Sequence, residues 1–347
     1  MSPSASKGSG AVRMRALAAT LPTQLKEGFR AGQALAPPAT GRSTTVFTVG
    51  MGGSGISSEL ARGVVEAETP VALKLVRSPD LPRAVEKKSR VVVVSYSGDT
   101  WEALRAYDAA GRAGASRIAL TSGGTLAERA ERDGVPVIPL PPGLPPRAAV
   151  GRIFGGILGL LDPWFPESNE DRVDRTANRV AALIPSYARA RGPARAIAAR
   201  IGSRVPVFYA ESSFVGLARR WKTQVEENAK RLAAFDEVPE LFHNAVVGWD
   251  AIGRSEAARY AVCLLQWAEE PALTRRGFAY VERLLTERGA QVVRVPLPAE
   301  DRLESIVGGV ALGDYVSLFL AEQRRVDPYP IDALTRLKTT LASQLRH

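Results

Sequence analysis

The chain has 347 residues, 45% of them hydrophobic, and carries 46 Lys and Arg against 36 Asp and Glu, which gives a net charge of +10. This length fits two domains of ordinary size, and the apolar fraction argues against wholesale disorder. A single cysteine, Cys263, excludes an internal disulfide framework, and two histidines, His243 and His347, argue against a metal site built from several histidines.

The positive charge is spread along the chain, without a helix-turn-helix signature, zinc-ligand spacing or interleaved aromatic and basic residues. We therefore expect no nucleic-acid partner. No apolar stretch reaches the length of a bilayer span, and Met1–Met14 lacks the apolar core of a signal peptide. These features predict a cytoplasmic protein with no membrane partner.

A helical apolar pattern covers Ala11–Ala36 and ends at Pro37-Pro38. Short apolar segments then alternate with helical ones, which is typical of a doubly wound parallel sheet. The run of four valines that ends at Val94 is typical of a strand buried on both faces. The predicted strands are Thr44–Val49, Val71–Val76, Arg90–Val94, Arg117–Thr121 and Val135–Pro139, and the predicted helices are Ile56–Ala67, Trp101–Ala113 and Leu126–Asp133.

The proline-rich segment Pro139–Pro146 interrupts this pattern, which then restarts after two linking helical stretches, Arg147–Leu161 and Glu167–Ala199. The restart indicates a duplicated α/β unit and two domains, residues 1–160 and 161–347. The second set of predicted strands is Val205–Ala210, Arg259–Trp267 and Gln291–Val295, and the predicted helices are Ser213–Lys230, Arg275–Arg288, Arg302–Ala321 and Ile331–Leu345.

A glycine-rich turn, Gly50-Met51-Gly52-Gly53-Ser54-Gly55, follows the first strand and matches the G-x-G-x-x-G fingerprint of dinucleotide-binding proteins. That function calls for an acidic residue after the second strand, where this chain has Arg77. Because Arg77 could hold a 2′-phosphate, an NADP-dependent oxidoreductase remains an alternative. The glycines could also serve only a tight turn.

A second loop, Ser95-Tyr96-Ser97-Gly98-Asp99-Thr100, carries hydroxyl side chains into the start of the Trp101 helix. The unpaired N–H groups and the dipole of a helix N-terminus attract phosphate, and Ser95, Ser97 and Thr100 add three hydroxyl donors. Capping of the helix by Ser97 or Asp99 is the structural alternative. Three hydroxyls around one glycine exceed what capping needs, so the loop predicts a phosphate site.

These two loops together resemble a SIS (sugar isomerase) domain, and the chain resembles the bifunctional phosphoglucose/phosphomannose isomerases, which contain two such domains. The resemblance implies two three-layer αβα domains with parallel sheets, no cofactor, and a phosphate site at Ser95, Ser97 and Thr100. It places Gly53 and Ser54 beside the substrate. The matching segments are Gly50–Ile56, Ser95–Leu104, Pro146–Ala149, Glu227–Lys230, Glu240–Val247 and the Lys338 helix.

The resemblance also implies catalytic residues. Isomerisation needs a base that moves a proton between C1 and C2, a group that opens the ring, and a cation near the enediolate. Glu227 of Glu-Asn-Ala-Lys matches the base, and His243 matches a ring-opening histidine contributed by the partner in a homodimer. Arg147 matches the arginine beside the enediolate, and Lys338 a lysine near the ring oxygen.

Each of these residues also has a structural interpretation. Glu226 and Glu227 before Lys230 could form an exposed i,i+4 ion pair, and the lone internal histidine His243 could be structural. Arg147 could end a proline loop at the surface, and Lys338 could be an ordinary exposed lysine. The family match favours the catalytic interpretation, with Glu226 facing away.

Several positions depart from the family pattern. Ile56-Ser57-Ser58-Glu59 replaces further glycines and an aspartate, and Asp99 replaces asparagine in the hydroxyl loop, which should weaken phosphate binding unless its carboxylate points away or caps the Trp101 helix. Ile331 stands where bifunctional members tend to have threonine, which bears on mannose 6-phosphate. Gln266-Trp267-Ala268-Glu269 replaces a second hydroxyl loop, so we expect no phosphate site in the second domain.

The leading interpretation is a cofactor-free, metal-free aldose–ketose isomerase that acts on glucose 6-phosphate, with mannose 6-phosphate as a further candidate substrate. A sugar-phosphate sensor that binds without turnover is the alternative from another class. Regulators with SIS domains usually carry a DNA-binding helix-turn-helix ahead of the domain, and the segment before Thr44 has room for a single helix only.

Overall fold

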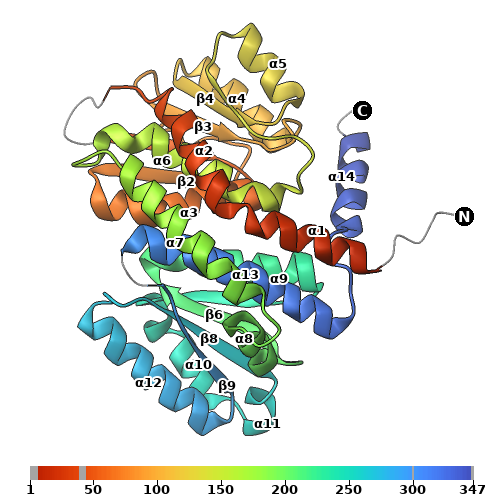
Figure 1. The fold of residues 1–347 in the computed structure, drawn as a ribbon. Helices are drawn as coiled ribbons and strands as arrows, with labels where there is room; N and C mark the ends of the chain where they lie inside the picture. Colours follow the sequence, from red (N-terminus) through yellow and green to blue (C-terminus); the bar gives the residue numbers. More distant parts are fainter. Residues whose placement is uncertain (1–6, 39–43, 299–300, 345–347) are drawn as a thin grey trace, which may run out of the picture.

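The computed structural model describes residues 7–38, 44–298 and 301–344. A five-stranded sheet of order β2-β1-β3-β4-β5 lies in the first half of the chain, and every neighbouring pair is parallel (Figure 1). β3, which contains the valine run, and its neighbour β1 are the most buried strands of this sheet. The strands are β1 (Thr44–Val49), β2 (Val71–Val76), β3 (Arg90–Val94), β4 (Ser116–Thr121) and β5 (Val137–Pro139), with helices α3 (Gly52–Glu68), α4 (Trp101–Arg112) and α5 (Gly124–Arg132).

A second parallel sheet, of order β7-β6-β8-β9, repeats this arrangement in the second half. In both sheets the strand that comes first in the chain lies between the second and the third, so the predicted duplication is visible in the topology. The elements are β6 (Val205–Glu211), η3 (Ser212–Phe214), α9 (Val215–Ala229), β7 (Ala234–Val238), η4 (Glu240–His243), α10 (Ala245–Ala251), α11 (Arg254–Ala257), β8 (Tyr260–Gln266), α12 (Ala272–Arg288) and β9 (Gln291–Pro296).

A layer of helices separates the two sheets, and α13 (Arg302–Arg324) runs through its middle (Figure 1). α13 packs against α9, α7 (Glu170–Ala188) and α8 (Pro193–Ile201), and α3 packs against α9. By length and composition α13 could cross a membrane, which corrects the prediction that no segment reaches that length. Its apolar stretch is wholly buried inside the protein, as in the core helix of a globular domain.

The predicted leading helix is two helices, α1 (Lys7–Ala19) and α2 (Leu21–Gln33). Pro22 lies in the first turn of α2, where its missing N–H costs nothing but where it cannot continue the preceding helix. α2 lies unusually close to α6 (Val150–Leu161), since a Cβ on Gly155 would come within 2.3 Å of a carbonyl oxygen of α2. The small residues of the predicted linking helix serve this close contact.

Other boundaries differ by a few residues, and one strand was missed. The first long helix of the sheet begins at Gly52 instead of Ile56, inside the glycine-rich turn itself. β7 was not predicted, because two of its five residues are Asp236 and Glu237. The last helix, α14 (Asp332–Gln344), projects from the body of the molecule (Figure 1), and Leu345, the predicted end, is outside the described residues.

Candidate functional site

The glycine-rich turn forms the first turn of α3 and packs against the segment that carries Arg147. Gly52 has φ +52, and a Cβ on Gly53 would lie 3.2 Å from the Pro146 carbonyl oxygen and 3.3 Å from the Arg147 Cα. Ser54, the next residue, is buried. The absence of a side chain at Gly53 therefore lets the end of β1 and the main chain at Arg147 approach each other.

The hydroxyl loop leaves the carboxyl end of β3, the neighbour of β1. Ser95 is buried, and its hydroxyl donates to the Thr100 Oγ1 at 3.0 Å. Ser97 is exposed and accepts the Asp99 N–H at 3.3 Å, so the Ser97 proton can still be donated to a ligand. Gly98 has φ +78, and a Cβ there would come within 1.9 Å of a neighbouring carbonyl oxygen.

The charge of Asp99 is directed away from the helix that follows the hydroxyl loop. One carboxylate oxygen of Asp99 accepts from the backbone N–H and from the hydroxyl of Thr125, at 3.0 and 2.9 Å. Thr125 lies in the first turn of α5, where the helix dipole stabilises an anion. Asp99 thus caps α5 and not the Trp101 helix, so donors at the start of α5 compensate its carboxylate.

Tyr96, which the sequence analysis did not single out, ties the hydroxyl loop to the proline-rich segment. Its hydroxyl donates to the Pro141 carbonyl and accepts from the Leu144 N–H, both at 2.7 Å. Burial raises the pKa of Tyr96, while the Leu144 bond opposes that shift. The segment held in this way leads into the short helix η1 (Pro146–Ala149), which carries Arg147.

Arg147 is buried, which corrects the interpretation of a surface arginine. Its Nε donates to the Asn228 Oδ1 at 3.0 Å, and its Nη1 lies 3.5 Å from the Glu227 Oε2. Its Nη2 donates to the carbonyl oxygens of Pro328 and Tyr329, at 2.8 and 3.0 Å. Burial lowers the pKa of the Arg147 guanidinium, and the Glu227 carboxylate opposes that shift. The guanidinium is therefore fixed in place beside the predicted base.

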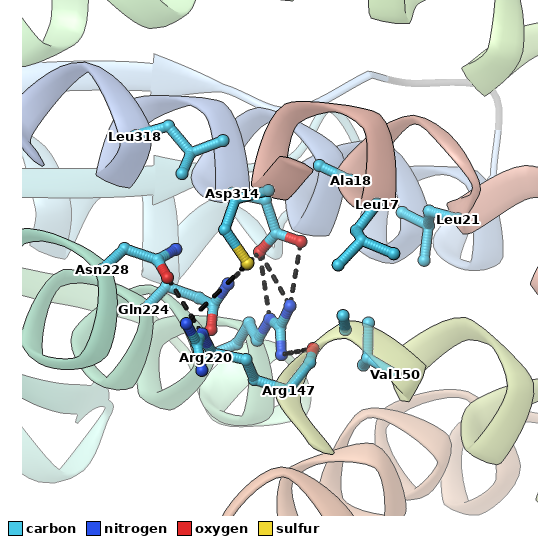
Figure 2. Close-up of a pocket in the computed structure, with 12 residues that line it drawn as sticks. Leu17, Ala18, Leu21, Arg147, Val150, Arg220, Gln224, Asn228, Asp314 and Leu318 are labelled. Atoms are coloured by element: carbon cyan, nitrogen blue, oxygen red, sulfur yellow. Dashed lines mark hydrogen bonds and ion pairs between the residues drawn. The ribbon is translucent and has the colours of Figure 1, made fainter. Parts of the chain in front are cut away.

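A buried ion pair between Arg220 and Asp314 lies next to the main chain of Arg147 (Figure 2). Arg220 donates to both carboxylate oxygens of Asp314 at 2.9 Å, and its Nη1 donates to the Arg147 carbonyl oxygen at 2.9 Å. The Gln224 amide also donates to Asp314. A cavity of about 10 Å³ adjoins these residues, which leaves room for one water but not for a sugar phosphate. The pair anchors the main chain of η1 to α9 and α13.

Glu227 lies in the last turn of α9, with a side chain that is 28% exposed. Glu226, its neighbour, forms an ion pair with Lys222 at 2.7 Å, which agrees with the prediction that Glu226 faces away. The predicted i,i+4 pair between Glu226 and Lys230 is not formed, because the Lys230 ammonium donates to main-chain carbonyls, among them Pro330 at 2.6 Å. The Glu227 carboxylate therefore contacts Arg147 and is partly exposed to solvent.

His243 is exposed and lies in η4, after the carboxyl end of β7. Glu227 precedes the amino end of the same strand, and five residues of strand span about 16 Å. Lys338 is also exposed, on the projecting helix α14. The structure of a single chain thus brings together Gly53, Ser54, Arg147 and Glu227, but it adds neither His243 nor Lys338 to them.

Arg77, the candidate for a 2′-phosphate, is engaged by a buried carboxylate. Its Nη2 lies 2.8 Å from the Glu59 Oε2, and Arg219 reaches the same oxygen at 2.7 Å. Glu59, one of the departures from the family pattern, is 3% exposed in its side chain. Since two arginines compensate this buried charge, Arg77 has a structural partner within the fold, which weakens the case for an NADP site.

One feature of the sequence indicates one member of the buried Arg220–Asp314 pair, which was not predicted. Asp314 is a single acid inside the apolar stretch of α13, and a buried carboxylate requires a cationic partner. Nothing in the sequence identifies Arg220 as that partner. Among the residues that the structure describes, no group of three or more His, Cys, Asp and Glu could hold a metal ion.

A larger hollow, of about 410 Å³, lies elsewhere, at the start of α7. Arg172 fills part of it and forms ion pairs with Glu68 and Asp301. None of the predicted site residues lines this hollow. The sequence and the geometry therefore point to the carboxyl end of the first sheet and not to the larger opening.

Comparisons with known proteins identify the family of the chain. Residues 190–341 match the family model described as the bacterial phospho-glucose isomerase C-terminal SIS domain. The chain is 31% identical to the bifunctional phosphoglucose/phosphomannose isomerase of Caldicellulosiruptor bescii over 334 residues, which cover 93% of this chain and 97% of the relative. It is 37% identical over 200 residues to the D-glucosamine-6-phosphate 4-epimerase of Sulfolobus acidocaldarius, covering 57% of this chain and 61% of that protein.

Solved structures confirm the fold. The tagatose-6-phosphate ketose/aldose isomerase of Escherichia coli superposes with a TM-score of 0.68 at 15% sequence identity, over 95% of this chain and 98% of that chain. Together with the two parallel sheets this confirms the predicted α/β class and the SIS-type architecture.

Proposed function

The chain belongs to the bifunctional phosphoglucose/phosphomannose isomerase family and is a sugar-phosphate isomerase, and from that premise we propose that it interconverts glucose 6-phosphate and fructose 6-phosphate. One observation carries the proposal. Arg147 and Glu227 come from different halves of the chain and meet at 3.5 Å, and the Arg147 main chain abuts the glycine-rich turn at Gly53. A base and a fixed cation therefore lie beside a loop suited to a sugar phosphate.

The phosphate would bind at the hydroxyl loop. The first N–H groups of α4 and the exposed Ser97 hydroxyl offer donors there, while Ser95 and Thr100 hold each other in place. The Asp99 carboxylate accepts hydrogen bonds at the start of α5, which offset part of its charge beside this position. The sugar would extend from the loop past Gly53 and Ser54 towards Glu227.

The isomerisation needs one carboxylate. Glu227 would take the proton from C2 of the open-chain aldose while the hydroxyl proton of O2 passes to O1, and it would return a proton to C1 of the resulting cis-enediolate to give the ketose. The buried Arg147 guanidinium would stabilise the negative charge that develops on the two oxygens. Its bonds to Asn228, Pro328 and Tyr329 fix it in advance, so no reorganisation is needed during the reaction.

Ring opening would need a second copy of the chain. His243 is exposed and lies at the opposite end of the second sheet from Glu227, so it would act in the site of a partner in a homodimer. A neutral imidazole can accept the anomeric proton at physiological pH. Lys338 would serve near the ring oxygen.

A mixing experiment tests this shared site. Glu227→Gln and His243→Ala variants should each be inactive alone, and co-refolding them in equal amounts should restore about a quarter of the wild-type activity. Half of the dimers would then be mixed, and each would contain one intact site. No recovery on mixing, with dimers confirmed by light scattering, would contradict the contribution of His243 across the interface.

A second candidate function follows from the 37% identity to the D-glucosamine-6-phosphate 4-epimerase. A coupled assay for fructose 6-phosphate with glucose 6-phosphate or mannose 6-phosphate, beside chromatography of glucosamine 6-phosphate incubations, separates the two. We expect fructose 6-phosphate from glucose 6-phosphate at a rate well above that of Glu227→Gln. Conversion of glucosamine 6-phosphate alone would favour the epimerase, and binding without turnover of any sugar would favour a sensor.

A further inference from the structure

Lys230 ends the helix that carries Glu227, in a conformation that suits glycine better. Its φ is +52, in the left-handed region, where helices commonly end in glycine. A lysine at such a position carries a steric cost that a glycine would avoid. The role of the lysine is therefore to be sought in its side chain and not in the backbone turn.

The Lys230 ammonium donates to three main-chain carbonyls. It caps the Glu227 carbonyl at the end of α9, and it reaches Pro330 at 2.6 Å and Pro328 at 3.4 Å. Burial and the neighbouring Arg147 lower the pKa of Lys230, which marks an ammonium placed close to the buried site. The side chain thus connects the end of α9 to the segment between α13 and α14.

The same segment is held by Arg147. The Arg147 Nη2 donates to the carbonyls of Pro328 and Tyr329, so Lys230 and Arg147 together bind three consecutive carbonyls, those of residues 328, 329 and 330. Two of these residues are prolines, which have no N–H and cannot bond in a helix or a sheet in the usual way. Two cations next to Glu227 therefore fix the path of this segment.

The position of α14 depends on this segment. Every side chain of α14 that the structure describes, from Asp332 to Leu341, is exposed, and α14 makes few contacts with the rest of the fold. A helix without a packed face is oriented by its connection. Lys338 lies two turns into α14, so a shift at Pro330 moves Lys338 as well.

We propose that Lys230 is a positioning residue: with Arg147 it fixes the Pro328–Pro330 segment against the end of α9 and so sets where α14 holds Lys338 relative to Glu227. The proposal rests on the proposed function, because it gives Lys338 a place in the reaction. It goes beyond that function in assigning Lys230 a task that does not involve contact with the substrate.

The matched test compares Lys230→Gly, which suits the left-handed conformation but lacks the ammonium, with Lys230→Arg, which keeps a cation. We expect Lys230→Gly to melt at or above the wild-type temperature, while hydrogen exchange in residues 331–344 becomes faster. Its kcat should fall about ten- to a hundredfold with little change in KM, as for a misplaced catalytic group. Lys230→Arg should recover much of the kcat and the slower exchange.

If Lys230 does not hold the segment, Lys230→Gly will keep wild-type kcat and wild-type exchange, and this outcome would overturn the proposal. Faster exchange with unchanged kcat would overturn the link to Lys338. If the wild-type protein produces no fructose 6-phosphate, the proposed function fails. The exchange comparison would still show whether Lys230 holds the segment.

Discussion

The two parallel sheets share their central strand order, but the loops at their carboxyl ends differ in chemistry. In the first sheet β1 and β3 lead into glycines and hydroxyls, with the exposed Ser97 among them. In the second sheet the equivalent strands β6 and β8 end in acids and aromatic side chains. The Trp267 indole donates to the Glu211 carboxylate at 2.9 Å, and the Trp267 ring packs on Phe214 at 5.2 Å.

The loops of the second sheet bond to one another. Glu270 completes the second cluster, where it accepts the Trp267 N–H and where burial, with a further contribution from Glu211, raises its pKa to about 7. The polar groups of this cluster are engaged with one another, whereas the hydroxyl loop of the first sheet keeps an exposed hydroxyl donor at Ser97. The second half instead supplies Glu227, on the helix that follows β6. In the proposed function, phosphate binding and proton transfer would thus come from different halves of the chain.

Removing the base tests the role of the second half most strongly. Glu227→Gln should lower kcat by about 10²- to 10⁴-fold, the usual contribution of a general base, without unfolding the protein. The coupled assay measures the loss. Glu226→Gln is the matched control, because Glu226 lies on the same turn but pairs with Lys222, and it should keep nearly full activity. Equal losses in both variants would argue that the effect comes from the helix and not from a base.

The predicted phosphate site of the first half can be tested by comparing Ser97 with a serine at the carboxyl end of the second sheet. Ser97→Ala should raise KM about tenfold or more, because one hydrogen bond to a charged group is lost. Ser212 is also exposed and follows β6, as the glycine-rich turn follows β1, so Ser212→Ala serves as the control and should leave KM unchanged. A rise in KM in the Ser212 variant would indicate that the second sheet also contacts the substrate.

The sequence predicted the parts of the fold that follow from local patterns. Alternating apolar segments predicted eight of the nine strands in the described part of the chain, and the glycines and hydroxyls after β1 and β3 predicted the phosphate loop. β7 was missed because Asp236 and Glu237 leave an edge strand without an apolar signature. Its existence depends on pairing with β6, which no local pattern encodes.

Less of the candidate site than of the fold could be predicted from the sequence. Glu227 and Arg147 came from the family resemblance, and their meeting at 3.5 Å depends on how α9 packs against η1. The support by Asn228 and by the Arg220–Asp314 pair is a tertiary effect between residues about 80 to 90 positions apart. The catalytic roles of all four residues stay predictions, and His243 and Lys338 are exposed in a single chain.

Titration of Glu270, at the carboxyl end of the second sheet, should make the free energy of unfolding depend on pH. This effect should be smaller than those of the substitutions at Glu227 and Ser97. The folded pKa of Glu270 is about 7 and the ordinary value is 4.5, so the protonated carboxyl is favoured by folding. Its contribution is fully present below pH 4.5 and is lost as the pH rises through 7, on the order of 1–3 kcal/mol. Glu211 and Arg275 also face this carboxyl and act in opposite directions. Glu270→Gln keeps an acceptor for the Trp267 N–H but cannot ionise.

Denaturant unfolding of the wild type and of Glu270→Gln between pH 5 and pH 8 measures this contribution. The free energy of unfolding of the wild type should fall relative to that of the variant as the pH rises, while Glu269→Gln, at the exposed neighbouring position, should follow the wild type. Parallel pH curves for all three proteins would mean that the Glu270 carboxylate is solvated in the folded state. The cluster around Trp267 and Glu270 would then be accessible to water, as the hydroxyl loop is. The two regions would differ only in the charge of their side chains.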